Sequence, residues 1–327
     1  MNVSGKRDEC GRFCYEAGTV KRRLCVTGLF VLFVGCAEKP QLSADEYFQQ
    51  GNTFFREEAL GAAIEHYRDL LDQYPFSEYN EEAELKIAHA QYLEGNYTEA
   101  VVALTDFQRR HPTSPNLPFV GYYLGMCYVR QAGTIDRDQT AAQNAQTYFV
   151  TVSRQYPDSP FAELAKEQLA RCREDLGRHE LYIADYYTRR GNSKAAEIRL
   201  IELASQYGDT DAAADGLMRL GQLYAESEQP DHAILAYRAL ARLHPGTTYA
   251  VDAQRQLQNL SAGASTLDSD PLDLLLAANG RQRAPTALET VQLPGIDLPK
   301  VSKRPTGAPG PAFGPNFDPF GRGRSYY

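Results

Sequence analysis

The sequence predicts an all-α protein built from repeated helix pairs, and two observations support this prediction. The first is a short phrase in which an Ala is followed four residues later by a bulky apolar residue and eight residues after that by a Pro. It occurs as Ala63/Tyr67/Pro75, Ala100/Leu104/Pro112, Ala145/Phe149/Pro157 and Ala233/Tyr237/Pro245, and a fifth copy has Ala196, Leu200 and Gly208. The second is its constant spacing, which puts the small and the large residue on one helix face, where a neighbouring helix can approach closely. Because Pro cannot continue a helix, it ends each unit, and the pattern is typical of a helical repeat array.

Residues 1–35 are predicted to form a lipoprotein signal peptide. Three basic residues at 21–23 precede an apolar run over 24–34, which is too short for a bilayer span of roughly 20 residues. The run ends at Gly35-Cys36, which resembles the bacterial lipobox, so Cys36 is predicted to carry the lipid and residues 36–42 to form a tether. The alternative is an ordinary signal peptide with an incidental Cys.

Charge and cysteine content limit the classes of partner. The formal net charge is −8, and about −11 without residues 1–35, so we do not expect a nucleic-acid partner. For the same reason we expect the lipid alone to attach the protein to the membrane. Of the six cysteines, Cys127 and Cys172 are the two that follow Cys36. Both lie on apolar helical patterns, so we expect buried free thiols, with a disulfide between them as the alternative.

Residues 43–160 are predicted to hold the first three helix pairs. Ser43 and Glu46 have the spacing of a capping box, which marks the start of a helix, and Gly95-Asn96 marks the turn inside the second pair. The first unit resembles the tetratricopeptide consensus at Tyr47, Gly51, Phe54, Ala63, Tyr67 and Pro75. This resemblance implies a right-handed superhelical array of five tetratricopeptide-like helix pairs.

The third unit carries an insertion, and a long helix follows it. Residues 133–138 are predicted to form the inserted loop, in which an Arg separates two acidic residues, so we expect no metal there. Residues 161–177 are predicted to be a connecting helix. Residues 178–260 are predicted to hold the fourth and fifth units and a closing helix, with separate helices at 182–190, 194–206 and 249–260.

Residues 261–327 are predicted to be a Pro/Gly-rich disordered tail. This stretch holds nine of the 18 prolines and shows little periodicity, so it cannot bury enough apolar surface to offset the entropy of ordering. Residues 272–277 are apolar, and the alternative for them is one or two helical turns that dock on another surface.

Signatures of catalysis are missing from the sequence, which has no phosphate-binding Gly loop, no His-Glu-x-x-His and no nucleophile elbow. We therefore expect neither an enzyme nor a cofactor, but an array that binds other proteins along a concave surface lined by the first helix of each unit. The helical phase predicts that this groove is lined by Phe48, Asn52, Phe55, Leu85, His89, Tyr92, Tyr122 and Met126. The alternative is that the connecting helix or the neighbouring unit covers these residues.

The chain resembles the BamD family, the lipoprotein subunits of the outer-membrane β-barrel assembly machine. The resemblance covers residues 25–255 and is carried by the lipobox, the repeats and the phrases Tyr74-Pro-Phe-Ser-Glu-Tyr79, His111-Pro-Thr-Ser-Pro-Asn116, Asp136-Arg-Asp138 and Tyr186-Tyr-Thr-Arg-Arg-Gly191. It implies an anchor through Cys36 in the outer membrane, facing the periplasm, beside other accessory lipoproteins. It also implies that the C-terminal units dock on the periplasmic domain of the barrel-forming subunit and that the N-terminal units receive unfolded outer-membrane protein precursors.

The resemblance also assigns residues to the docking site. Arg199 matches the family arginine that pairs with an acidic residue of the barrel-forming subunit, and Tyr186 and Tyr187 begin a phrase that is specific to the family. The alternative for Arg199 is a solvated side chain. The alternative function is a periplasmic repeat scaffold that coordinates cell-envelope or division complexes.

Overall fold

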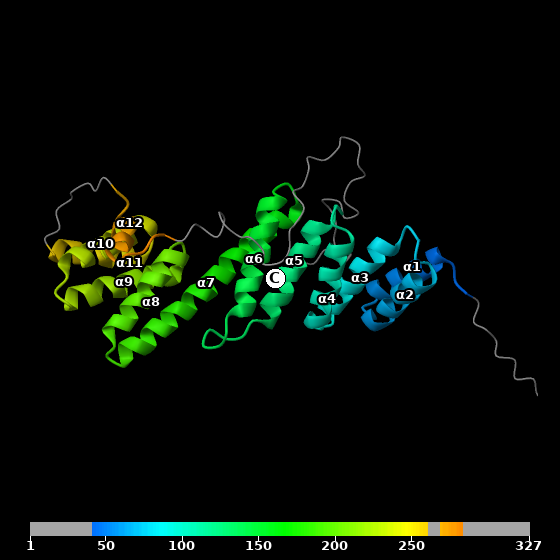
Figure 1. Ribbon diagram of the computed structural model, residues 1–327, viewed down its shortest axis with the longest axis horizontal. Helices are drawn as coiled ribbons and strands as arrows, with labels where there is room; N and C mark the ends of the chain where they lie inside the picture. Colours follow the sequence, from blue (N-terminus) through cyan, green and yellow to red (C-terminus); the bar gives the residue numbers. More distant parts are fainter. Residues whose placement is uncertain (1–40, 261–268, 284–327) are drawn as a thin grey trace, which may run out of the picture. The chain divides into compact units, whose positions relative to one another are not determined.

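The computed structural model describes residues 41–260 and 269–283, which Figure 1 shows as a succession of helices. The predicted signal peptide, Cys36 and most of the predicted tail lie outside the described residues. Within the described ranges the regular secondary structure is α-helical throughout. The helices are α1 (Ala44–Arg56), α2 (Leu60–Gln73), α3 (Asn80–Leu93), α4 (Tyr97–Arg110), α5 (Leu117–Gln131), α6 (Thr140–Gln155), α7 (Pro160–Arg189), α8 (Ser193–Tyr207), α9 (Asp211–Glu226), α10 (Pro230–Leu243), α11 (Thr248–Asn259) and α12 (Pro271–Ala278).

Helices that follow one another in the chain pack against one another from α1 to α11. In all five copies of the repeated phrase, both the Ala and the bulky residue are buried. The structure thus confirms an all-α array of tetratricopeptide-like helix pairs. The right-handed superhelix stays a prediction.

A glycine on the first helix of three pairs faces the aromatic ring of the second helix. A Cβ added at Gly51 would lie 2.6 Å from the Tyr67 ring, and one at Gly125 would lie 2.6 Å from Phe149. Because real Cβ atoms do not approach so closely, these positions accept only Gly while the ring keeps its place. The same contact recurs in the last pair, between Gly221 and Tyr237. Gly51, a position of the tetratricopeptide consensus, therefore lies where α1 and α2 approach closely.

Local signals in the sequence fix two of the helix ends. Ser43 caps α1: its hydroxyl accepts from the backbone N–H of Glu46, while the Glu46 carboxylate accepts from the backbone N–H of Ser43 at 2.7 Å. This is the predicted capping box. Gly95 has φ of +84°, which glycine adopts readily, and it ends the turn between α3 and α4 as predicted.

Helix α7 differs from the sequence-based expectation. A connecting helix ending at residue 177 and another helix at 182–190 were predicted, whereas one helix runs from Pro160 to Arg189. The predicted break was wrong because Gly177 serves packing inside the helix, where a Cβ would lie 3.0 Å from Thr210 Oγ1. The boundary drawn between residues 177 and 178 therefore falls inside α7. The division of the array into two parts stays a prediction.

Part of the predicted disordered tail is a docked helix. Leu272, Leu275 and Leu276 of α12 are buried in one cluster with residues of α8, α9 and α10. Asp270 caps the helix by accepting from the backbone N–H of Leu272 at 2.9 Å. The prediction that residues 261–327 are disordered was thus wrong for this segment. The alternative, docked helical turns at 272–277, is confirmed. The reason is that three leucines share one helix face and find a matching apolar surface.

The two cysteines that follow Cys36 are buried free thiols, as predicted, and not a disulfide. Burial raises the pKa of both Cys127 and Cys172 to about 12, so neither is reactive as a thiolate at neutral pH. Among the helices that the structure describes, none combines the length and the apolar character of a membrane span.

Candidate functional site

Arg199, the predicted docking residue, lies on α8 and faces α7. Its guanidinium donates to Glu180 Oε2 at 3.3 Å, and the two side chains are 40% and 18% exposed. A partly exposed ion pair contributes only about 0–1 kcal/mol to stability. Glu180 therefore orients Arg199 but does not bind it strongly enough to exclude a second carboxylate.

Tyr186 and Tyr187 lie on α7, the helix that packs on α8. Their rings are 5.5 Å apart in an edge-to-face arrangement, and the Arg190 guanidinium lies 4.7 Å from the centre of the Tyr186 ring. Tyr186 is exposed and Tyr187 is half-buried. The structure thus puts the three predicted docking residues on one helix pair.

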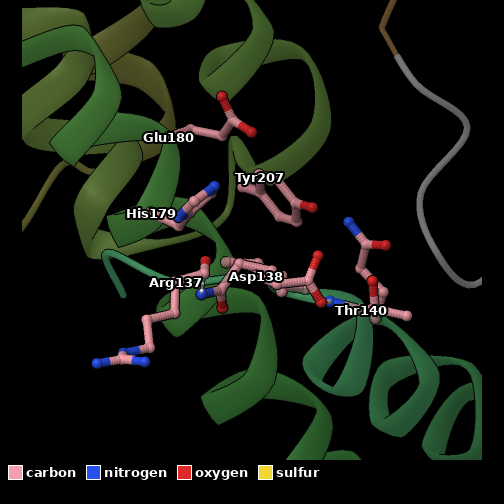
Figure 2. Close-up of a pocket in the computed structure, with 9 residues that line it drawn as sticks. Arg137, Asp138, Thr140, His179, Glu180 and Tyr207 are labelled. Atoms are coloured by element: carbon pink, nitrogen blue, oxygen red, sulfur yellow. Dashed lines mark hydrogen bonds between the residues drawn. The ribbon is translucent and has the colours of Figure 1, made fainter. Parts of the chain in front are cut away.

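A pocket of about 280 Å³ shares Glu180 with this ion pair (Figure 2). It is formed by the α5–α6 loop, the start of α6, the middle of α7 and the end of α8. Its lining residues are Arg137, Asp138, Gln139, Thr140, Gln143, Leu176, His179, Glu180 and Tyr207. The loop that the sequence singled out as an insertion is therefore one wall of a pocket.

Hydrogen bonds hold that loop in place. Gln139 Nε2 donates to the carbonyl oxygens of Arg137 and Thr134, at 2.8 and 3.1 Å. His179 of α7 binds the Ile135 carbonyl through Nδ1. Because a carbonyl oxygen only accepts, Nδ1 of His179 carries the hydrogen.

The charges that face the pocket are acidic. Asp138 accepts from the backbone N–H of Thr140 at 3.0 Å. Hydrogen bonds from Thr140, first from its side chain and then from its backbone, lower the pKa of Asp138, so this carboxyl is ionised at neutral pH. Glu180 supplies the second carboxylate, and Figure 2 shows the Arg137 guanidinium extending away from the other labelled groups.

Tyr207 closes the pocket from α8. It is only 8% exposed, and its ring lies 5.5 Å from the guanidinium carbon of Arg173. Its hydroxyl makes no hydrogen bond to any residue that the structure describes, although it lines the pocket wall. Burial raises the pKa of Tyr207, so the hydroxyl keeps its hydrogen at neutral pH.

Three residues predicted to line the N-terminal groove are buried instead. Phe48 stacks on Tyr79 with ring centres 4.7 Å apart, and the ring of His89 meets that of Phe119 edge-on at 5.4 Å. Leu85 is buried in the core between the second and third pairs. The groove assignment was wrong for these three, and the alternative, that a neighbouring unit covers them, holds. Successive pairs come close enough for these positions to pack between units.

Asn52 and Phe55 are half-buried and share a cation with Phe48. Lys86 Nζ donates to Asn52 Oδ1 at 2.8 Å and lies 5.7 and 5.8 Å from the ring centres of Phe48 and Phe55. The Tyr67 hydroxyl donates to the same Asn52 oxygen at 2.8 Å. Burial lowers the pKa of Lys86. This end of the predicted groove therefore combines a positive charge with aromatic rings.

Tyr92, Tyr122 and Met126 are also half-buried. The Tyr92 ring lies 5.1 Å from that of Tyr123, and the Tyr122 ring lies 5.5 Å from that of Phe161. Burial raises the pKa of Tyr122 to about 12. These side chains are partly exposed, and their use in precursor binding stays a prediction.

Sequence reasoning missed Glu180, Tyr207 and Lys86. Glu180 and Tyr207 reach the site only because α7 and α8 fold back on each other, and no local pattern marks that pairing. Lys86 had a signal, the Glu82 four residues before it, with which it pairs at 3.4 Å. That spacing is typical of a solvated helix face, so it did not point to the aromatic rings.

A family model described as YfiO, outer membrane lipoprotein, matches residues 40–233. The matched range contains Arg199 and all the pocket residues, whereas α12 lies beyond it.

Several proteins named outer membrane protein assembly factor BamD are similar to the chain. The one from Xylella fastidiosa (strain 9a5c) is 30% identical over 211 residues, which cover 60% of this chain and 72% of that protein. The one from Haemophilus influenzae is 27% identical over 217 residues, covering 62% of this chain and 83% of that protein. The one from Vibrio cholerae is 28% identical over 228 residues, covering 65% of this chain and 94% of that protein.

Proposed function

The chain belongs to the YfiO family of outer membrane lipoproteins, and we propose that it serves outer-membrane protein assembly as a binding subunit rather than as an enzyme. Its relatives are named outer membrane protein assembly factors. We assign to this chain a scaffold role in the assembly complex, docked on the barrel-forming subunit and in contact with unfolded precursors. An array of helix pairs supports this role, because such arrays bind proteins through extended surfaces.

The proposal places the protein at the outer membrane, facing the periplasm. The lipobox at Cys36 supports attachment through a lipid on that residue. The half-buried aromatic side chains and Lys86 in the N-terminal units support contact with precursor chains that carry aromatic residues.

The observation that carries the docking proposal is that Arg199 is partly exposed and only weakly paired. It lies in the range matched by the family, is two-fifths exposed and is held by one weak ion pair to Glu180. A guanidinium can bind a carboxylate through two hydrogen bonds, whereas Glu180 accepts one from Arg199. An acidic residue on a partner that accepts both therefore binds Arg199 more strongly than Glu180 does. Tyr186 adds an exposed aromatic face on the neighbouring helix.

The test is a pull-down of the mature, detergent-solubilised protein from its own envelope, beside Arg199→Glu. The matched control is Arg109→Glu, because Arg109 is an arginine on α4 that is 77% exposed and also pairs with an acid. We expect a barrel protein with periplasmic domains to co-purify with the wild type and the control. We expect Arg199→Glu to lose at least about nine-tenths of it, because a like charge now faces the partner's acid.

Two results contradict the proposal in different ways. If the barrel protein co-purifies equally with wild type and Arg199→Glu, the assembly role stands and Arg199 is not the contact. If cell-division or peptidoglycan proteins co-purify instead, the chain is a scaffold for those complexes.

A further inference from the structure

We propose that the pocket between the α5–α6 loop, α7 and α8 binds a basic side chain, Arg or Lys, of the folded partner that docks at Arg199. This inference rests on the proposed function, because it takes docking at α7 and α8 as its premise. It adds a second point of recognition and the chemistry that recognises it.

Two carboxylates supply acceptors on the pocket walls, and two of the wall donors are already in use. Asp138 and Glu180 bring two carboxylates from different elements. The amide nitrogen of Gln139 donates to two loop carbonyls, and Nδ1 of His179 donates to the Ile135 carbonyl. A guest that donates hydrogen bonds and carries positive charge therefore complements Asp138 and Glu180. An anion would meet two carboxylates at short range.

Tyr207 is an independent sign that the pocket takes a guest. A tyrosine hydroxyl on a side chain that is 92% buried normally has a hydrogen-bond partner, and this one has none among the described residues. Because this hydroxyl lies on the pocket wall, its oxygen is available to accept from a guest. The Tyr207 ring and Leu176 also provide apolar surface for the methylene stem of a long basic side chain.

The volume of the pocket also favours a long side chain. A water molecule occupies roughly 30 Å³ in the liquid. At about 280 Å³, the pocket has room for a side chain with its head group and some of its hydration water.

The Arg199–Glu180 ion pair links the two recognition points. When a partner carboxylate takes Arg199, Glu180 loses its cation and becomes free for the cation in the pocket. The exchange replaces one ion pair inside the chain by two across the interface. A matching partner therefore presents an acidic and a basic residue side by side.

The experiment measures the affinity of the mature, full-length lipoprotein in detergent for the purified periplasmic domain of its own barrel-forming subunit. Asp138→Asn removes the charge but keeps an oxygen that can accept from the backbone N–H of Thr140, and Tyr207→Phe removes only the hydroxyl. The control is Asp106→Asn, which removes the charge of a carboxylate on α4 that pairs with Arg109 and does not line the pocket. We expect Asp138→Asn to raise the Kd about tenfold and Tyr207→Phe about threefold, with no change for Asp106→Asn.

A double-mutant cycle identifies the guest. Each exposed Arg and Lys of the domain is replaced by Ala and titrated against wild type and against Asp138→Asn. One of these replacements is expected to weaken binding to the wild type about tenfold and to have little further effect on Asp138→Asn. As a probe, N-acetyl-arginine methylamide is expected to weaken docking of the wild type more than N-acetyl-glutamine methylamide does.

The outcomes separate this inference from the proposed function. If the wild type binds, Arg199→Glu weakens binding and the pocket variants bind like the wild type, docking stands and the pocket proposal is overturned. Coupling to no Arg or Lys of the domain also overturns it. If the wild type does not bind the domain, the proposed docking and the pocket proposal both fall.

Discussion

At the scale of single residues, His89 shows how an ionisable group is made part of the core. It is 3% exposed, and its ring lies 5.6 Å from that of Phe55 and 4.6 Å from that of Tyr123, so it joins α1, α3 and α5. Burial, and then the nearby charge of Lys86, lower its pKa from 6.5 to about 3. The folded protein therefore holds His89 as a neutral ring.

This depressed pKa makes stability depend on pH in a defined window. Between pH 6.5 and about 3 the unfolded chain binds a proton at His89 that the folded chain does not, so the free energy of unfolding falls as the pH falls. Within this window the free energy of unfolding changes by about 1.4 kcal/mol per pH unit. Above pH 6.5 none of this stability is lost. We expect His89→Leu to lose that part of the pH dependence in urea unfolding between pH 6.5 and 5.

The control for this measurement is His232→Leu, a histidine on α10 that bonds to Gln229 near the surface. Its slope against pH is expected to match that of the wild type. Parallel slopes for wild type and His89→Leu across the same window would show that His89 takes up a proton in the folded state.

At the scale of elements, α12 acts as a strap across the last two helix pairs. Its leucines fill an apolar surface of α8, α9 and α10, and ion pairs flank it, Arg281 with Glu202 at 2.9 Å and Arg283 with Asp270 at 3.2 Å. The three buried leucines contribute more to the stability of this contact than the exposed ion pairs do. Replacing one buried leucine by Ala costs about 2–5 kcal/mol, whereas an exposed ion pair contributes about 0–1 kcal/mol.

Truncation separates this strap from the rest of the tail. A chain ending at residue 283 is expected to unfold thermally like the full chain, whereas a chain ending at residue 260 exposes the apolar surface and unfolds at a lower temperature. Leu275→Ala in the full chain is expected to cost about 2–5 kcal/mol. Equal midpoints for the two truncated chains would mean that α12 adds nothing to the stability of these pairs.

The elements that the sequence predicted well are those with a local cause. The capping box at Ser43, the turn at Gly95 and the repeated phrase act within one helix pair, and all are found in the structure. The continuity of α7 and the docking of α12 were missed because contacts distant in sequence decide them. The site divides in the same way: Arg199 was assigned from the resemblance to the family, while the pocket needs residues from four elements.

At the scale of the whole array, α7 carries two packing stripes. Ala165, Leu169 and Cys172 belong to the cluster with α6, at helical spacing. One residue later a second stripe begins with Arg173, whose Nε donates to Asp209 Oδ2 at 3.0 Å, and it continues through Glu180. Successive residues of a helix are about 100° apart around its axis. A shift of one residue therefore makes the second stripe face a direction about 100° from that of the first.

Changing the length of α7 tests this arrangement. One Ala inserted between Cys172 and Arg173 turns the second stripe by about 100° and breaks the Arg173–Asp209 and Glu180–Arg199 contacts. We expect a lower thermal midpoint and loss of docking to the barrel-forming subunit. The same insertion between residues 264 and 265 is the control and is expected to change neither. An unchanged midpoint and intact docking in the α7 variant would mean that the two stripes are independent.

The unbroken course of α7 also determines how this chain can diverge. Substitutions along the helix alter side chains one at a time, but each inserted or deleted residue re-aims every unit that follows. In lineages descending from this protein, changes in the length of α7 are therefore confined to steps of about seven residues, close to two full turns, which restore the original direction of the helix.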